Sequence, residues 1–348
     1  MFFLLIYFIT FIKIFSTMNN PDRQFAFSTT MKPYIFLFSI LMTSCVWAQR
    51  DSTYIKPYEH KFSLRTYLAI NFLSMEQQTG TEEYKKFMPN NPPNIGLGFS
   101  LNNTIVNVSY GQGFNFMRDK EKGKTKALDL QIHNYGKKFI FDVFIQRYRG
   151  FYAEDESGNV LALYPDLKIQ QYGVFGQYVF NNKKFSYRAA FNQNEKQLKS
   201  AGSFLIGGGV YFSKIESDSS FVHEKRNSLH NFQFGVSGGY AYLWVINKRW
   251  FAGISTTVGV NIGSEKFNTF GKERIEVYPT LFPRVALGYN TENWSAGFSY
   301  VNNTIFSAFS DNDNANVSLF SGNFKISYIR RLDSFDFLKK KKNQRTQD

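Results

Sequence analysis

From Phe62 to Arg331, apolar and polar side chains alternate with a period of two, and this pattern limits the fold more than any other feature of the sequence. Successive side chains of a β-strand point to opposite faces, so alternation gives each strand one apolar and one polar face. In residues 125–134, for example, three aliphatic side chains alternate with Asp129, Gln131 and His133. The sequence therefore predicts an all-β fold.

Alternating segments recur along the chain at lengths that suit a membrane crossing. A transmembrane β-strand needs about 9–11 residues. We identify twelve candidates: 62–73, 94–102, 104–111, 125–134, 138–149, 167–180, 203–213, 230–245, 249–261, 277–289, 293–302 and 317–331. We therefore predict a transmembrane antiparallel outer-membrane β-barrel of about twelve strands over residues 62–331.

The connections between these segments fall into two classes. Short ones, rich in Asn, Gly and Lys, lie at 102–103, 134–137, 246–248 and 290–292. Longer ones lie at 74–93, 112–124, 150–166, 214–229, 262–276 and 303–316. Short periplasmic turns that alternate with long external loops are typical of bacterial barrels, so we expect both termini in the periplasm.

Residues 182–202 stand where a short turn is expected. Phe185, Tyr187, Ala189 and Phe191 have the spacing of a further strand, which would be the thirteenth, whereas single-chain bacterial barrels have even numbers. Two interpretations stay open. The segment is an excursion into the periplasm or the lumen, or it is a hairpin that makes a barrel of fourteen strands.

Aromatic content separates this barrel from a soluble β-sandwich, which would also show alternation. Aromatic residues make up 18% of the chain, with 39 Phe and 21 Tyr. They favour strands and gather at membrane–water interfaces. A sandwich would bury the apolar faces of its sheets against each other and turn polar faces outward. The aromatic density on the apolar face, together with an export signal, favours the membrane barrel.

The export signal lies at residues 31–48. Lys32 supplies a positive charge, Tyr34 to Met42 form a short apolar stretch, and the segment ends in small residues at Ala48, which is the secretory pattern. A lipid-modified Cys45 is the alternative. Residues 1–30 hold a second apolar run, which indicates a mis-assigned start or, alternatively, a membrane anchor. Residues 49–61 would then be a periplasmic N-terminal segment, and residues 332–348 a basic periplasmic tail.

Charge and cysteine content exclude several functions. The formal net charge is +14, but an exported protein is not expected to meet nucleic acid. Cys45 is the single cysteine, so a chain cleaved after Ala48 has no disulfide and no thiolate metal site. We expect no cofactor and no metal. The expected partners are outer-membrane lipid and lipopolysaccharide, the barrel assembly machinery of a Gram-negative cell, and an unknown small solute.

Charged residues on the polar face are the candidate lumen-lining residues. They are Arg65, Asp129, His133, Asp142, Arg284 and Lys325. Closing twelve strands makes the first and the last neighbours, so the basic groups would lie across from the two carboxylates. Opposed charges across a narrow lumen can orient dipolar solutes. Alternatively, the same charges form salt bridges that fill the lumen and only stabilise it.

An enzyme is a further possibility, because a carboxylate can orient a histidine that activates a hydroxyl or water. Asp129 and His133 share a face, but four residues of strand separate them by roughly 13 Å. Asp142, on the adjacent strand, could partner either of them. No nucleophilic serine can be placed beside them, and a lumen histidine is usually only hydrogen-bonded. The catalytic interpretation is therefore the weaker one.

Four stretches resemble a family of domains of unknown function from Bacteroidota-type bacteria. They are 54–58 (YIKPY), 91–98 (NPPNIGLG), 135–139 (YGKKF) and 187–193 (YRAAFNQ). The resemblance implies an outer-membrane barrel and implies no activity. Three functions follow from the sequence: passage or binding of a small polar or anionic solute, an enzyme acting on lipid or lipopolysaccharide, or a structural barrel with a plugged lumen.

Overall fold

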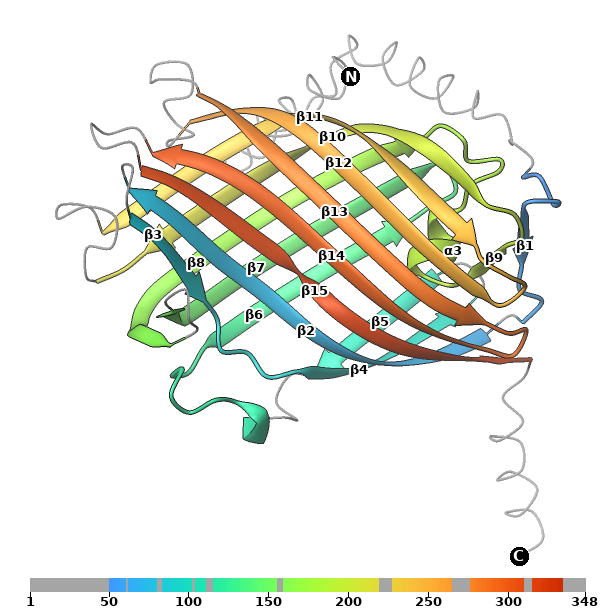
Figure 1. Cartoon of the computed structure of the whole chain (residues 1–348), viewed down its shortest axis with the longest axis horizontal. Coiled ribbons are helices and arrows are strands. Elements are labelled where there is room, and N and C mark those ends of the chain that lie inside the picture. The colour runs from blue at the N-terminus through green and yellow to red at the C-terminus, as the bar shows by residue number, and fades with distance from the viewer. Residues whose placement is uncertain are drawn as a thin grey trace, which may run out of the picture. The chain divides into compact units, whose positions relative to one another are not determined.

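Antiparallel strands close into a barrel in the computed structural model of the chain (Figure 1). The structure describes residues 50–60, 62–79, 83–101, 104–110, 115–154, 159–218, 227–264, 276–309 and 315–333. The expected start, the signal peptide and Cys45 lie outside the described residues, as does the tail from residue 334. Among the described residues, no helix has the length and hydrophobicity needed to span a membrane.

All twelve expected segments contain a strand, which confirms the predicted all-β barrel. They are β2 (Phe62–Thr79), β4 (Asn94–Leu101), β5 (Thr104–Tyr110), β6 (Lys126–Tyr135), β7 (Phe139–Glu154), β8 (Val160–Val179), β10 (Ala201–Glu216), β11 (Ser228–Val245), β12 (Trp250–Ser264), β13 (Glu276–Asn290), β14 (Trp294–Phe309) and β15 (Ala315–Leu332). Additional elements are β1 (Ile55–Pro57), β3 (Glu83–Met88), a 3-10 turn η2 (Asn115–Met117), α3 (Tyr187–Phe191) and β9 (Glu195–Gln197).

Ten strands form the closed hydrogen-bonded ring, in which β15 pairs with β2 and β3 joins β2 to β7. The remaining strands of the sheet lie beside this path. β4 pairs with the first part of β2, Phe62 to Ala69, β5 pairs with β4, and β6 pairs with β7. The pairings among the described strands do not join β5 to β6. Pro92 and Pro93 separate β3 from β4, because proline lacks the N–H that a continuous ladder needs.

Strands reach further toward one end of the barrel than their alternation predicts. We call this the long-loop end, and the opposite end, with the turns 136–138, 246–249 and 291–293, the short-turn end. The expected loop 150–166 is mostly strand, since β7 ends at Glu154 and β8 begins at Val160. Likewise, β2 continues to Thr79. Beyond the alternating segments these strands continue through backbone hydrogen bonds, and the sequence of side chains gives no sign of this extension.

The outer face of the wall is apolar. On β7, for example, Phe139, Phe141 and Ile145 are 47%, 49% and 36% exposed, while the alternate positions Ile140 and Phe144 are buried. The same exposure of large apolar side chains continues around the wall, as at Leu68, Leu97, Ile132, Val174, Phe204, Ile254, Val258, Leu287, Phe324 and Ile326. A surface of this kind is unfavourable in water and suits hydrocarbon.

The inner face packs into three apolar clusters that follow one another along the barrel. The first, at the short-turn end, surrounds α3 and contains Tyr135, Ile140, Phe185, Tyr187 and Phe191 among others. The second consists of Phe144, Phe175, Tyr211, Phe282 and Ile305. The third, toward the long-loop end, contains Leu73, Met75, Phe87, Tyr148, Phe151, Leu167, Ile169, Ile215, Leu229, Val317 and Leu319.

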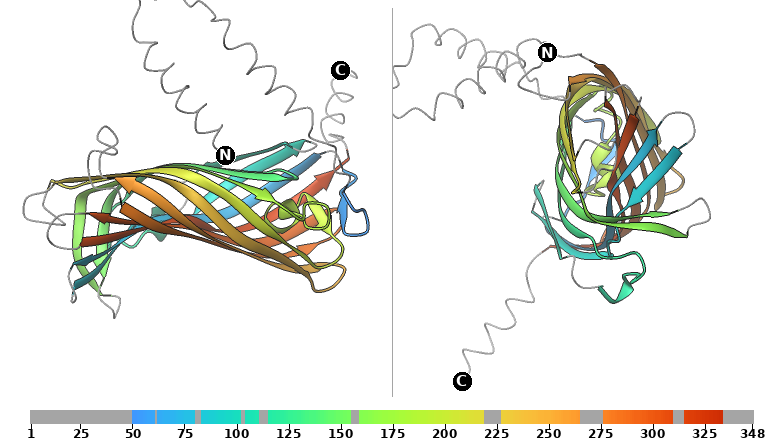
Figure 2. Two further views of the ribbon diagram at one scale, coloured as in Figure 1. Left: turned by 90° about the horizontal axis from the view of Figure 1, so that it is seen from above. Right: turned by 90° about the vertical axis from the view of Figure 1, so that its left-hand side faces the viewer.

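Residues 182–200 enter the barrel at the short-turn end, where Figure 2 shows α3 inside the ring of strands. The lumen-entering interpretation therefore holds, and the fourteen-strand alternative is wrong. Tyr187 to Phe191 form a short helix, not a strand, and all five residues are buried. Because the wall surrounds this helix on every side, its sequence lacks the polar face that would have revealed a helical period. We call residues 182–200 the plug.

Candidate functional site

The six candidate charges all lie on inner-face positions of their strands. Asp142 and Arg284, on β7 and β13, meet in the centre: an Arg284 amino group donates to Asp142 Oδ2 at 2.5 Å, and both side chains are 2% exposed. Arg284 also donates to the Tyr135 hydroxyl at 3.2 Å. On the other carboxylate oxygen, His133 Nδ1 lies 2.6 Å away. Asp142 is thus shared between a guanidinium and an imidazole.

Asp129 belongs to a second polar group, on β6 and β7. The Tyr148 hydroxyl donates to its Oδ2 at 2.5 Å, and the side-chain amides of Gln146 and Gln131 donate at 3.1 and 2.9 Å. Asn323, on β15, then donates to Gln131 Oε1 at 3.0 Å. Three neutral side chains therefore donate to this carboxylate, and Asn323 supports one of them, Gln131.

Arg65 and Lys325 lie on the paired strands β2 and β15, as expected of the first and last strands of the barrel. Arg65 is 5% exposed and donates to the backbone carbonyl of Asn192 in the plug. Lys325 is half-buried on the same inner surface. The basic pair is therefore separate from the carboxylates: among the described residues, the guanidinium that pairs with Asp142 is that of Arg284, from a different part of the ring.

Side chains from strands that are not neighbours in the ring touch each other at several levels. Phe175 on β8 and Phe282 on β13 pack edge to face, with ring centroids 4.8 Å apart. Gln177 on β8 donates to Thr257 Oγ1 on β12 at 3.0 Å. Gln233 on β11 donates to Ser307 Oγ on β14 at 3.1 Å. With the pair of Asp142 and Arg284 and the amide contact to Asn323, these contacts cross the lumen at five places.

Wall glycines make these close approaches possible. A Cβ atom on Gly173 of β8 would lie 2.1 Å from the Phe144 ring of the neighbouring β7. The absent side chain lets the ring fold flat against the wall, where it stacks 6.2 Å from Tyr211. The end-on view in Figure 2 shows a flattened ring of strands, in agreement with walls that approach each other.

His133 and Asp142 have the geometry of a carboxylate that orients an imidazole, but no further catalytic group is described beside them. The other ring nitrogen, Nε2, is buried and has no hydrogen-bond partner among the described residues. Asp142 is at the same time the counter-ion of Arg284. In the part of the chain that the structure describes, no group of His, Cys, Asp and Glu is arranged to hold a metal ion. A hydrolytic site would also need a nucleophile beside Nε2.

An ionic group holds the plug together. Glu195 is buried and pairs with Arg188 at 3.2 Å and with Arg50, which comes from the N-terminal segment. Ser186 Oγ donates to the same carboxylate at 2.7 Å and accepts from the Ala189 N–H, which caps α3. Burial, with the charge of Arg188 second, lowers the pKa of Arg50 to about 10. Burial also lowers the pKa of Arg188.

The N-terminal segment extends the plug. β1 pairs with β9 as a separate two-stranded sheet, with Ile55 opposite Gln197. The Leu198 N–H donates to the Tyr54 carbonyl at 2.7 Å. Lys184 and Lys199 of the plug lie 5.2 and 5.3 Å from the Tyr54 ring. The residues that follow the expected cleavage point are therefore part of the folded base of the barrel.

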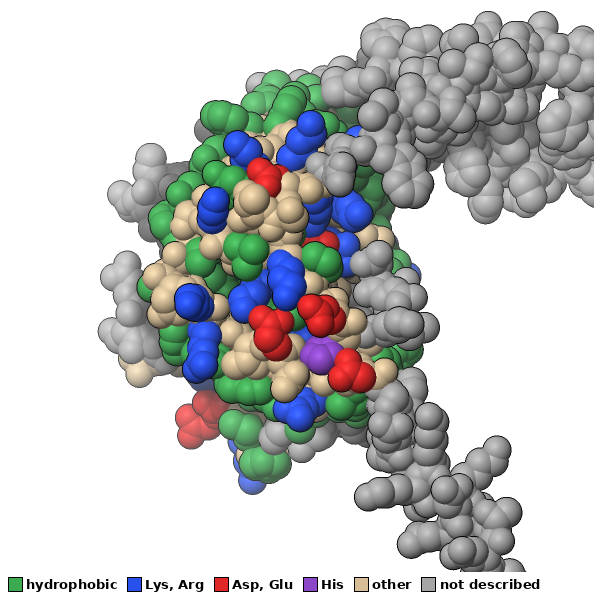
Figure 3. All heavy atoms as spheres, turned by 90° about the vertical axis from the view of Figure 1, so that its right-hand side faces the viewer, with side chains coloured by type: hydrophobic (Ala, Val, Ile, Leu, Met, Phe, Trp, Pro, Cys, Tyr) green, Lys and Arg blue, Asp and Glu red, His purple; other side chains and the backbone are tan. Residues whose placement is uncertain are grey.

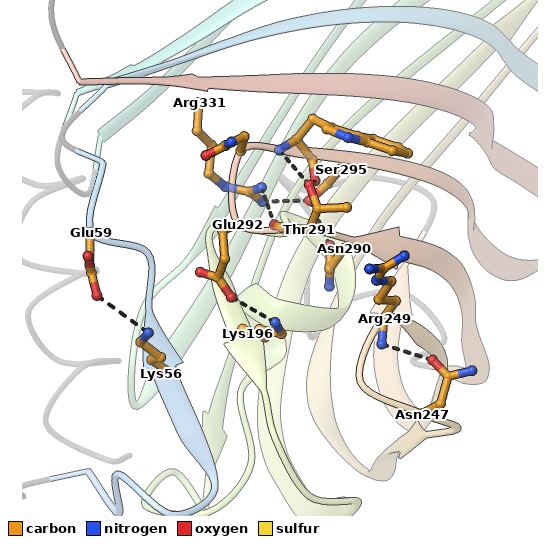
Figure 4. A network of polar contacts seen from close by, with 12 residues as sticks. Lys56, Glu59, Lys196, Asn247, Arg249, Asn290, Thr291, Glu292, Ser295 and Arg331 are labelled. Atoms are coloured by element: carbon orange, nitrogen blue, oxygen red, sulfur yellow. Dashed lines mark hydrogen bonds and ion pairs between the residues drawn. The ribbon is translucent and has the colours of Figure 1, made fainter.

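Polar contacts join the plug to the turns of the wall (Figure 4). Lys196 donates to Glu292 at 2.9 Å. Arg331, on β15, donates to the Gln193 carbonyl at 2.9 Å and to Ser295 Oγ at 2.6 Å. Gln193 has a φ of 50°, unusual for a residue with a side chain. Its side-chain amide lies where a Cβ on Gly297 would come within 2.7 Å, so this glycine makes room for the plug.

The surface of the short-turn end carries charged side chains, and the plug and the N-terminal segment lie across it. Figure 3 shows Lys and Arg side chains spread over this face with Asp, Glu and one His between them. Hydrogen bonding to Lys196 lowers the pKa of Glu292 on this surface. His60 contributes a contact to Asp333 at 2.5 Å, which joins the N-terminal segment to the end of β15. The base of the barrel is therefore a closed assembly of plug, N-terminal segment and turns.

A family model for a domain of unknown function (DUF4421) matches residues 49–331. The chain belongs to this family. The match includes the N-terminal segment, the plug and β15 as far as Arg331. A search of curated proteins finds no match. The DUF4421 assignment gives a family without an activity.

Solved structures similar to this DUF4421 chain are outer-membrane proteins. The protease OmpT from Escherichia coli aligns with a TM-score of 0.35 and 8% identity over 78% of this chain and 96% of that one. OprG from Pseudomonas aeruginosa aligns at 0.22 and 10% identity, over 80% and 99%. A Pseudomonas aeruginosa FadL homologue aligns at 0.24 and 9%, over 78% and 90%. At these scores the barrel assignment rests on the strand pairing itself.

Sequence reasoning missed the residues that complete these polar groups. Tyr135, Tyr148 and Gln131 alternate with apolar residues like any inner-face side chain, and nothing marks them as partners of a charge. Arg188 and Glu195 of the plug carried no signal either. The length of 182–202, at a position where a short turn is expected, was the available sign that this segment of the DUF4421 chain does not belong to the wall.

Proposed function

We propose that the protein is a sealed outer-membrane β-barrel, with its short turns in the periplasm, that serves as a membrane-embedded scaffold rather than as an open pore. Contacts between opposite walls are the observation that carries this proposal. An inner side chain that lines an open channel would be accessible to water, whereas Leu73, Phe282, Arg284 and Leu319 are all 2% exposed or less. These residues come from different levels and different strands.

The membrane placement has its own support. Strand pairing closes the ring through β3, and the ring strands pair with neighbours on both sides along most of their length, as hydrocarbon requires of backbone N–H and C=O groups. Among the described pairings, the outer edges of β5 and β6 are not joined to each other. The outward side chains are large and apolar. The secretory pattern at residues 31–48 supports export, and the alternation of short turns with long loops supports periplasmic termini. Among the three functions open from the sequence, this arrangement favours the filled structural barrel.

Gated passage is a second candidate, and the plug is the observation that favours it. Its contacts with the wall include many hydrogen bonds and ion pairs to surface turns, such as Lys196 to Glu292. Polar contacts of this kind exchange readily with water. Displacing the plug alone would still leave the pairs of Phe175 with Phe282 and of Asp142 with Arg284 across the lumen. Passage would therefore need the wall to change shape as well.

Conductance across a planar bilayer tests the proposal with three proteins. The first is the wild type, the second replaces residues 183–199 by a short turn, and the third adds Phe175→Gly, Phe282→Gly, Asp142→Gly and Arg284→Gly to that deletion. We expect no conductance steps from the first two and steps from the third. Steps from the wild type would contradict a sealed barrel. Steps from the plug deletion alone would establish gated passage instead.

A further inference from the structure

A patch of basic side chains lies on the outer wall, away from the lumen and the plug. It spans β6, β7, β8 and β10 and consists of Lys126, Arg147, Arg149, Lys168 and Lys214. Strand register places Lys126 beside Arg149, Arg149 beside Lys168, and Lys214 beside Gln170, which neighbours Arg147. Cross-strand partners share a face, and Arg147 and Arg149 are exposed, so all five side chains are on the outside.

The patch holds more positive charge than its own carboxylate can neutralise. Glu216 is the acidic residue in these two register rows, and it pairs with Lys168 at 3.1 Å and with Lys214. Gln170 also donates to Glu216, at 3.1 Å. Lys126, Arg147 and Arg149 have no carboxylate within ion-pair distance among the described residues. Three cations are therefore available to an external anion.

Arg147 is held in position on this surface. Its Nε donates to the Tyr172 hydroxyl at 2.7 Å, and its guanidinium carbon lies 5.6 Å from the centre of that ring. The Tyr172 hydroxyl in turn donates to Gln170 Oε1 at 3.0 Å. The bond through Nε leaves the two amino groups of the guanidinium as a donor pair, which suits bidentate contact with a phosphate.

Apolar rows begin directly beside the patch on the same strands. The adjoining register row is Leu130, Ile145, Tyr172, Phe212 and Phe232, and the next is Ile132, Val143, Val174, Val210 and Phe234. Neither row contains a charge. Rows of cations therefore adjoin rows of aliphatic and aromatic side chains, with neighbouring strands roughly 4.8 Å apart. An amphiphile with an anionic head and hydrocarbon chains matches both parts at once.

We propose that this patch binds the phosphate groups of an anionic glycolipid of the outer leaflet, of the lipopolysaccharide type, with the acyl chains of the lipid against the apolar rows. The inference rests on the membrane placement and orientation proposed above, because the patch lies toward the long-loop end of β7 and β8. Arg147 and Arg149 contact one phosphate, and Lys126 completes its neutralisation. Lys168 and Lys214, already paired with Glu216, flank it.

Binding of lipid A to the full chain in phosphatidylcholine nanodiscs tests the proposal. The test variant is Lys126→Gln, Arg147→Gln and Arg149→Gln together. The matched control is Lys137→Gln, Lys183→Gln and Lys248→Gln, which removes the same charge from exposed positions at the short-turn end. We expect the test variant to bind bisphosphorylated lipid A at least about tenfold more weakly than the control and the wild type. Removing the phosphates of lipid A should weaken wild-type binding similarly.

The lipid site would be overturned if the test variant and the wild type bound lipid A with equal affinity. It would also be overturned if removing the phosphates of lipid A left wild-type binding unchanged. Phosphatidylglycerol vesicles and free inorganic phosphate distinguish other sources: competition by either at equal concentration would also overturn a glycolipid site. Heat-modifiable mobility on gels checks that each variant is a folded barrel. A chain that fails to insert into bilayers would refute the proposed function, whereas an inserted, sealed barrel without phosphate-dependent binding would refute this inference alone.

Discussion

The inner and outer faces of one strand place opposite requirements on their side chains, and two neighbouring residues of β7 show the contrast. Val143 points out from the wall in a row without charges, whereas Asp142, one residue earlier, is buried against Arg284 and His133. On the outside each side chain needs only to be apolar. On the inside each polar atom needs a specific partner, because an unpaired buried charge is costly. The outer face is therefore tolerant of exchange, and the inner face is not.

Removing the inner charge should have the largest effect. Asp142→Asn leaves Arg284 buried without its anion, so we expect the free energy of unfolding to fall by about 3–5 kcal/mol. Urea titration of the barrel in detergent micelles measures the change. The double variant Asp142→Leu with Arg284→Met should recover most of the loss, because it removes both charges. A loss under about 1 kcal/mol in the single variant would show that the pair is not buried.

Placing a charge on the adjacent outer position should cost somewhat less. Val143→Lys puts an ammonium group into the hydrocarbon layer, which lowers the free energy of unfolding by about 2–4 kcal/mol near the midplane. Refolding from urea into lipid vesicles measures it. As a control, Val143→Leu should be nearly neutral in the same assay. If the lysine were tolerated as well as the leucine, β7 would not face lipid.

One aromatic substitution made on both faces sharpens the comparison. Phe282→Leu loses the edge-to-face contact with Phe175 and changes the shape of a packed interior, so we expect a loss of about 1–3 kcal/mol. Phe204→Leu alters an outward side chain that is 70% exposed, and its effect should stay below about 0.5 kcal/mol. Thermal unfolding followed by gel mobility compares the two variants. Equal losses would mean that the interior is not tightly packed.

The smallest expected effect is a pH dependence at the base of the barrel. The hydrogen bond from Lys196 holds the pKa of Glu292 below its ordinary 4.5. A carboxylate with a lowered pKa stabilises the fold above pH 4.5 and loses that contribution as the pH falls through its folded value. This exposed pair contributes under about 1 kcal/mol. The protection factor of the Leu198 amide against hydrogen exchange, that is, the exchange rate relative to an unfolded peptide at the same pH, should therefore fall modestly between pH 5 and pH 3 in the wild type.

Lys196→Met provides the reference for that measurement. In this variant the loss of protection below pH 4.5 should be smaller, because Glu292 loses its hydrogen-bond partner, the largest cause of its lowered pKa, and keeps only the weaker attraction of Lys56 and Arg331. An identical pH profile in the wild type and the variant would assign the effect to other carboxylates of the base.

The sequence predicted the wall better than the interior, for a physical reason that β6 illustrates. Leu128, Leu130 and Ile132 face lipid because alternation is a local property of consecutive residues, and the same local pattern placed Asp129 and His133 on the inner face. It could not say that His133 would pair with Asp142 while Asp129 would bond to Tyr148. Those choices depend on strand register and on the distance between opposite walls.

The sequence by itself determined the class of fold, the strands and their apolar outward rows, because hydrocarbon imposes one rule on each outward residue that meets it. The tertiary structure alone decided which inner side chains meet across the barrel. Flattening of the ring brings β7 and β8 within reach of β12 and β13, and the plug completes the base through partners such as Arg50 and Glu195, which lie 145 residues apart. Contacts between residues so far apart arise when the ring closes, and a periodic pattern carries no record of them.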